Sequence, residues 1–284
     1  MKNSPFLLSL LILLSPLLSL SQPDTEVYLM DLRRSSEGLV VEKPVNISSN
    51  KGYDNQPSFW SDSESVLYAR NVEGQTEIAR YYPESGNTLI ITNTFGGSEY
   101  SPTLMPDGRI SSIRLDTTGL QLLYAYTFRG LDEVLVPELK IGYHAWINSN
   151  DIVAFVLGDP ATLQIINTAS MENKIIGQNI GRSLHKIPGS SSFSYLDKSS
   201  DEWEIKSMNP ISGESTFLVK AIEGSEDYAW TPKEEIIMGS GSKLFAWKKD
   251  GEWVEIADLS SHSIKNITRI AVSPDGKKVA VVGD

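Results

Sequence analysis

Short β-forming segments separated by turn residues recur along the chain from residue 26 to its end. Strands are predicted at residues 65–69, 109–113 and 278–282, between clusters of Gly, Pro, Asp and Ser. Over the same part of the chain, no segment of ten or more residues repeats its apolar positions every 3.6 residues, as a surface helix would. The pattern therefore predicts an all-β protein.

One motif, an apolar strand followed by a turn and a second strand, returns several times. Residues 56–62, 101–108 and 268–276 match one another most closely. The Pro-Asp-Gly sequence in two of these copies favours a turn, because Pro presets φ, Asp accepts hydrogen bonds from the backbone and Gly accepts positive φ. Weaker copies of the motif occupy residues 143–149, 184–189 and 227–232.

The period of this repeat predicts the fold. The central residues of the six first strands are Phe59, Leu104, Trp146, Lys186, Trp230 and Val272. They lie 45, 42, 40, 44 and 42 residues apart. Such a period with several short strands is typical of β-propeller blades. We therefore predict a six-bladed β-propeller with four-stranded antiparallel blades.

The two ends of the repeat region complete one another. The last period holds only its first two strands, whereas Glu26–Leu32 and Leu39–Ile47 resemble third and fourth strands with no inner pair before them. We expect the last blade to combine both ends, which closes the ring without an open sheet edge. The alternatives are seven blades, if two are merged around residues 155–200, or an open solenoid.

The first 21 residues have the pattern of a cleavable signal peptide. Lys2 precedes a Leu-rich run from Phe6 to Leu20, and small residues flank a cleavage site before Gln22. An uncleaved N-terminal anchor is the alternative. We expect one propeller domain over residues 22–284, an extracytoplasmic location (periplasmic or secreted), and no transmembrane segment in the mature chain, because no second apolar run of this length occurs.

The repeat resembles the WD40-like repeat of TolB-type propellers. The resemblance rests on the Ser-Pro-Asp-Gly turn at 273–276, on strands such as Thr76–Ala79, and on Glu26-Val27-Tyr28 in the equivalent place. It spans residues 24–284 and implies a six-bladed ring, export and a protein-binding role in the cell envelope. The α/β domain of TolB proper is expected to be absent, because only Gln22–Thr25 precede the first strand.

Composition excludes several classes of function. The chain has no cysteine, which excludes disulfides, thiolate metal sites and a cysteine nucleophile. Its net charge of −11 argues against nucleic-acid binding, and removal of Lys2 with the signal peptide would make that charge −12.

The connectors that lead into the first strands carry the candidate binding residues. In a propeller these connectors surround one mouth of the central channel. They contain Tyr53, Asp54, Glu99, Tyr100, Tyr143, His144, Glu226, Asp227 and Tyr228. Tyr is common at recognition surfaces, so we interpret the set as an acidic aromatic rim for a peptide, a basic partner or a cation. The alternative is that these tyrosines pack between blades.

Other motifs have structural explanations. Asp62, Asp107 and Asp275 recur in the turns and are expected to cap them. His144, His185 and His262 occupy unlike repeat positions, so we expect no metal site. The sequence Gly239–Lys243 joins two strands instead of opening a helix, which disfavours a phosphate loop.

The sequence thus predicts a monomeric, non-enzymatic binding protein of the bacterial envelope, with a protein or peptide as its partner. No catalytic residue and no cofactor are assigned, although a structural or channel cation such as calcium stays open. The alternative is an enzyme, either a metal-dependent hydrolase of the lactonase type or a degenerate peptidase-associated propeller.

Overall fold

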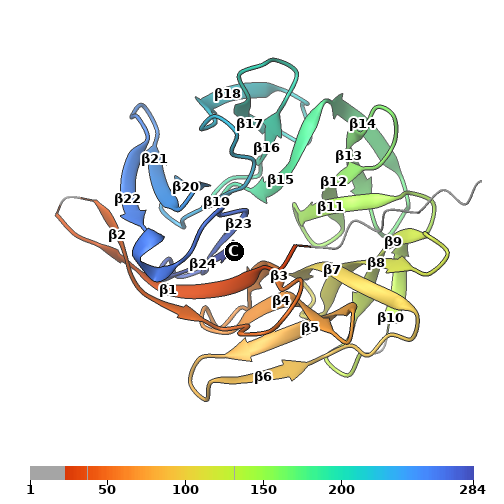
Figure 1. Cartoon of the computed structure of the whole chain (residues 1–284). Helices are drawn as coiled ribbons and strands as arrows, with labels where there is room; N and C mark the ends of the chain where they lie inside the picture. Colours follow the sequence, from red (N-terminus) through yellow and green to blue (C-terminus); the bar gives the residue numbers. More distant parts are fainter. Residues whose placement is uncertain (1–22, 37, 131) are drawn as a thin grey trace, which may run out of the picture.

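The computed structural model describes residues 23–36, 38–130 and 132–284, which form a ring of six blades around a central channel (Figure 1). Each blade is a four-stranded antiparallel sheet, and the strand nearest the channel comes first in sequence in five of them. The six-bladed prediction is therefore confirmed, and the seven-bladed and open-solenoid alternatives are wrong.

Five blades follow one another along the chain. Blade one is β3 (Asn55–Phe59), β4 (Val66–Val72), β5 (Gln75–Tyr82) and β6 (Asn87–Ile90). Blade two is β7 (Gly97–Leu104), β8 (Ile110–Asp116), β9 (Gln121–Tyr126) and β10 (Asp132–Val136). Blade three is β11 (Ile141–Trp146), β12 (Asp151–Val156), β13 (Thr162–Asn167) and β14 (Asn173–Gln178). Blade four is β15 (Ile180–Lys186), β16 (Phe193–Asp197), β17 (Glu204–Met208) and β18 (Ser215–Lys220). Blade five is β19 (Tyr228–Trp230), β20 (Glu235–Ser240), β21 (Lys243–Lys248) and β22 (Val254–Asp258).

The repeat positions and turn residues behave as the sequence predicts. All six central residues, from Phe59 to Val272, are the last residues of their innermost strands. The carboxylate of a turn aspartate accepts a hydrogen bond from the backbone N–H two residues later in the chain. Asp107 accepts from the Arg109 N–H at 3.0 Å, and Asp275 accepts from the Lys277 N–H at 3.0 Å. These contacts confirm a capping role for Asp107 and Asp275.

Blade six is built from both ends of the described chain. Its strands are β23 (Arg269–Val272), β24 (Lys278–Gly283), β1 (Glu26–Arg34) and β2 (Leu39–Asn46). A short 3₁₀ helix (Ser260–His262) lies between β22 and β23. Strand β1 pairs with β24 from Glu26 opposite Gly283 to Asp31 opposite Lys278. In Figure 1 the red β1 accordingly runs beside the blue β24 near the centre of the ring. This pairing confirms the predicted closure.

The hydrophobic core is divided among the seams between blades. Six clusters of buried apolar side chains each combine residues of two neighbouring blades. At the seam of blades six and one, for example, Val27 and Val282 pack with Phe59 and Tyr68. Successive side chains along a strand point to opposite faces of its sheet. Each blade can therefore contribute apolar side chains to the seams on both of its sides.

The predicted signal peptide, residues 1–21, lies outside the described residues. Among the residues that are described, no helix has the length and apolar character needed to cross a bilayer.

We predict that stability depends on packing at the closing strands. Val281 is fully buried opposite Tyr28 of β1, whereas Val45 on β2 is 52% exposed. Val281→Ala should lower the free energy of unfolding by about 2 kcal/mol, because it leaves a cavity where the closing strands pack at the seam of blades five and six. Val45→Ala should change it by less than about 0.5 kcal/mol. Urea unfolding followed by tryptophan fluorescence measures both, and equal losses in the two variants would contradict the prediction.

Candidate binding site at the channel mouth

The connectors between blades open on one face of the ring, and a set of six side chains gathers there. We call this set the channel mouth, and it takes one residue from each blade. Its members are Tyr53, Tyr100, Tyr143, Arg182, Asp227 and Arg269. Tyr53 and Asp227 stand just before their innermost strands, and the other four lie within theirs.

The aromatic half of the channel mouth comes from blades one to three. The rings of Tyr53 and Tyr100 meet edge to face, with centroids 6.1 Å apart. The Tyr143 ring packs edge to face on Phe155 at 5.9 Å. Burial raises the pKa of Tyr53 to about 12, so its hydroxyl is protonated at neutral pH and can donate a hydrogen bond.

The charged half is organised around Asp227. Its Oδ2 atom accepts hydrogen bonds from Arg182 Nη2 at 2.7 Å and from Arg269 Nη1 at 2.6 Å. Burial alone would lower the pKa of Arg269, but the charge and hydrogen bond of Asp227, together with the nearby hydroxyls of Tyr143 and Tyr53, raise that pKa. One carboxylate thus holds two guanidinium groups, and Glu226 beside the channel mouth, 3.7 Å from Arg182, offsets part of the remaining positive charge.

Two contacts join blades that are not neighbours in the ring. Arg269 of blade six donates from Nη2 to the Tyr143 hydroxyl of blade three at 3.4 Å, with its guanidinium 5.7 Å from that ring's centroid. Arg182 of blade four donates from Nη2 to the Thr268 carbonyl oxygen at 3.0 Å. These contacts fix the arginine side chains in place before any ligand arrives.

The face is hollowed beside the two arginines. A cavity of about 190 Å³ is lined by Tyr53, Asn55, Arg182 and Arg269 among others. A second cavity of about 270 Å³ shares Arg182 with the first and extends toward Glu226 and Asp227. The arginines are therefore reachable from the connector face.

The residues predicted from sequence divide into two groups. Tyr53, Tyr100, Tyr143 and Asp227 lie at the channel mouth, and Glu226 lies beside it, 3.7 Å from Arg182. The side chains of Asp54, Glu99 and Tyr228 are fully buried, and His144 is nearly so. The interpretation as an exposed acidic rim is therefore wrong for Asp54, Glu99, His144 and Tyr228.

The physical reason is the alternation of side chains along extended backbone. In each adjacent pair, such as Glu99 with Tyr100 or Asp227 with Tyr228, one residue faces the channel and its neighbour enters the seam between blades. Tyr228, for example, donates from its hydroxyl to Ser194 at 2.9 Å within the seam of blades four and five. The sequence-based alternative of packing between blades is correct for this residue.

His144 and His185 also have structural roles. His144 Nε2 lies 2.7 Å from Ser111 Oγ, which also accepts a hydrogen bond from Trp146. The His185 ring packs at a tilt of 53° against Tyr228, with centroids 4.8 Å apart. Burial lowers the pKa of both imidazoles to about 4, so both are neutral at pH 7. No group of three or more His, Asp or Glu side chains in the described ranges could hold a metal ion.

Sequence reasoning missed Arg182 and Arg269. They lie four and three residues before their central residues Lys186 and Val272, the same offsets that Tyr100 and Tyr143 have from theirs. If the residues three and four positions before the central residue had been considered in every period, and not only where one of them is Tyr, both arginines would have been found.

Buried carboxylates lie next to the channel mouth at the seam of blades one and two. Glu99 Oε1 accepts hydrogen bonds from Thr94 Oγ1 at 2.7 Å and the Tyr126 hydroxyl at 3.0 Å. Its Oε2 has no hydrogen-bond partner among the described residues. Burial raises the pKa of Glu99, and the negative charge of the buried Glu77 adds to that rise.

We predict that Glu99 makes stability fall as pH rises. A carboxyl whose pKa is raised on folding binds its proton more tightly in the folded state, so its ionisation above the ordinary value of 4.5 disfavours that state. Glu99→Gln removes this ionisation. The free energy of unfolding of the variant, relative to the unchanged protein, should therefore rise by roughly 1–3 kcal/mol between about pH 5 and pH 8. Urea titrations at each pH measure it, and a difference that stays constant would show that Glu99 ionises normally.

Comparisons with known proteins bear on the fold. No protein-family model and no curated protein matches the chain. A solved structure of a putative TolB from Agrobacterium tumefaciens is 11% identical with a TM-score of 0.71, over 92% of this chain and 99% of that one. A gluconolactonase from Xanthomonas campestris is 7% identical with a TM-score of 0.66, over 93% and 98%. An oligogalacturonate lyase in complex with manganese is 13% identical with a TM-score of 0.59, over 86% and 81%.

At identities this low the likeness extends to the fold and carries no activity with it. The TolB resemblance noted in the repeat is present in the architecture, since the alignment with the putative TolB covers nearly the whole of both chains. In its fold, the chain is a TolB-type six-bladed β-propeller.

Proposed function

We propose that this protein is an exported, non-enzymatic binding module of the bacterial cell envelope that holds a protein or peptide partner at the channel mouth. The observation that carries the proposal is the convergence of three tyrosines and two arginines, from five different blades, on one hollowed face. Tyr and Arg are the residue types that dominate binding energy in protein interfaces, together with Trp.

The charge of the channel mouth favours one kind of ligand group. Asp227 is already held by Arg182 and Arg269, so it is not free for a cation or a basic side chain. The two guanidinium groups, by contrast, have more N–H donors than are used by Asp227, the Thr268 carbonyl oxygen and the Tyr143 hydroxyl. We therefore favour a peptide that presents an acidic group, in place of the basic partner or cation expected from the sequence.

The envelope location in this proposal rests on the sequence of residues 1–21, whose short apolar run and cleavage pattern are those of a signal peptide. The fold is compatible with it, because one of the similar structures is a putative TolB.

We predict that tyrosine side chains at the channel mouth contribute to peptide binding. Peptides selected from a phage-displayed random library on the immobilised protein should bind the double variant Tyr100→Ala/Tyr143→Ala at least about tenfold more weakly, because the variant loses contact area and hydrogen-bonding hydroxyls. Fluorescence anisotropy with labelled synthetic peptides measures the dissociation constants.

The matched control is Phe217→Ala, which removes a half-exposed aromatic ring from β18 on the outside of blade four. It should leave the affinity unchanged. Peptides that bind all three proteins equally would place recognition elsewhere and contradict the proposal.

The competing proposal is a metal-dependent enzyme, which the similar lyase and gluconolactonase folds suggest. The protein is equilibrated with calcium or manganese and desalted, and its metal content is then measured by mass spectrometry. If the protein binds its partner without a metal, well below one metal ion per chain is expected. One ion per chain, lost in Glu99→Gln or Asp227→Asn, would favour the enzyme.

A further inference from the structure

A second hollow lies on the face opposite the channel mouth. It is formed by the β1–β2 hairpin of blade six and by the turns that follow the innermost strands β19 and β23. These turns stand at the far ends of the innermost strands from the connectors. The hollow measures about 610 Å³, which lies in the range of small-molecule sites. We call it the seam pocket, because it lies between blades five and six.

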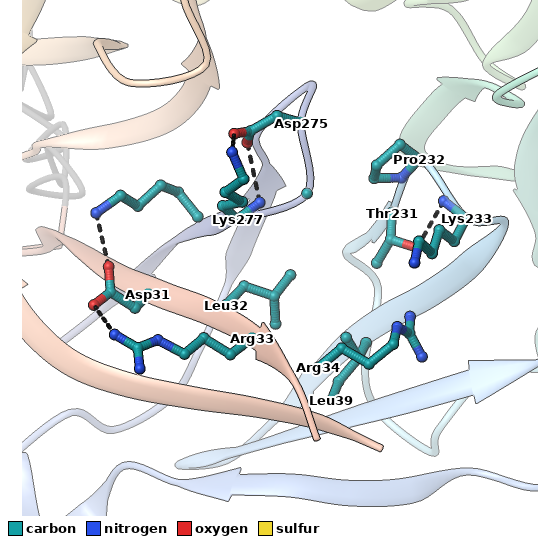
Figure 2. Close-up of a pocket in the computed structure, with 12 residues that line it drawn as sticks. Asp31, Leu32, Arg33, Arg34, Leu39, Thr231, Pro232, Lys233, Asp275 and Lys277 are labelled. Atoms are coloured by element: carbon teal, nitrogen blue, oxygen red, sulfur yellow. Dashed lines mark hydrogen bonds and ion pairs between the residues drawn. The ribbon is translucent and has the colours of Figure 1, made fainter. Parts of the chain in front are cut away.

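The seam pocket is lined by an unusual share of cations for this acidic chain. Of its twelve lining residues five are basic, namely Arg33, Arg34, Lys233, Lys277 and Lys278. Figure 2 shows that they come from three separate segments, with Arg33 and Arg34 on β1, Lys277 on the turn after β23 and Lys233 on the turn after β19.

The carboxylates around the seam pocket do not balance these cations. Asp31 alone is shared by Lys278 at 2.7 Å, Lys43 at 3.2 Å and Arg33 at 3.7 Å. Arg34 Nη1 donates to Glu235 Oε1 at 3.1 Å.

Two further carboxylates offset part of this positive charge, and one lysine stays unpaired among the described residues. Lys277 is 3.1 Å from Asp275, and Arg33 is also 3.6 Å from Glu42. Lys233 forms no ion pair within the described part of the chain. Six cations, with Lys43 included, thus meet four carboxylates, in a protein that carries 36 acidic and 25 basic side chains.

The walls of the seam pocket are held in a fixed arrangement. The Arg34–Glu235 pair ties the β1–β2 hairpin to blade five. The two turns touch so closely that a Cβ atom at Gly276, where φ is +71°, would lie 2.8 Å from Pro232 Cγ. Leu32 and Thr231 are buried beneath the cations. The backbone segments that carry the charged groups are therefore positioned by the fold, which reduces the backbone entropy lost on binding.

We propose that the seam pocket binds a doubly charged phosphate group, in the form of a phosphate monoester or free phosphate. An excess of two positive charges matches a dianion better than a single carboxylate, and Arg and Lys are the side chains that bind phosphate oxygens. The pocket is distinct from the channel mouth and does not depend on the function proposed there.

The test uses four probes on the purified protein. Inorganic phosphate and glucose 6-phosphate are titrated by calorimetry, with glucose as the neutral counterpart. Vesicles of phosphatidylcholine with and without phosphatidic acid, whose headgroup is a phosphate monoester, are tested by co-sedimentation. Saturable binding of the soluble phosphates identifies a soluble ligand, and binding of only the phosphatidic acid vesicles identifies a lipid headgroup.

The variants separate the seam pocket from general charge effects. Lys233→Ala/Lys277→Ala removes two exposed cations and should weaken binding at least about tenfold, since charge-assisted hydrogen bonds are lost. Lys51→Ala/Lys140→Ala removes two exposed lysines from the connector face and should leave binding unchanged. The proposal is overturned if no phosphate probe binds, if glucose or pure phosphatidylcholine binds equally, or if both double variants bind alike.

Discussion

The antiparallel pairing of β1 with β24 is the interaction on which the rest of the structure depends. Every other blade is a local meander, but this one joins residues about 250 positions apart, as in the pair of Tyr28 with Val281. Once that pair forms, every blade has a neighbour on both sides and six seams can bury their apolar clusters. Both candidate sites also depend on it, because β23 carries Arg269 to the channel mouth and β1 carries Arg33 and Arg34 to the seam pocket.

The channel mouth shows how a ring of blades uses alternation along a strand. Side chains that face the channel meet partners from other blades, as Arg269 meets Asp227 and Tyr143. Their sequence neighbours enter the seams, where carboxylates such as Asp54 and Glu99 are buried with raised pKa values. Substitution of a residue that faces the channel should therefore affect binding, whereas substitution of its neighbour in the seam should affect stability.

The two faces of the propeller differ in chemistry because they are built from different loops. The connectors and the innermost strands that follow them bring Tyr and Arg to the channel mouth. The turns after the innermost strands, together with the β1–β2 hairpin, gather Lys and Arg at one seam of the opposite face. The net charge of −11 for the whole chain does not indicate the local charge at either of these two sites. Local charge follows from which turns the fold places together.

The sequence by itself determined the period, the four-stranded blades, the six central residues and the closure by both ends, because turn chemistry and alternating strands are local properties. It also identified Tyr53, Tyr100 and Tyr143 as candidate binding residues, although the last two lie within their innermost strands and not in the connectors. Only the tertiary structure decided which member of each adjacent pair faces the channel, and it alone brought Arg182 and Arg269 onto Asp227 from three blades. Such contacts join residues more than 40 positions apart, so their geometry depends on blade tilt and ring closure, which no local pattern encodes.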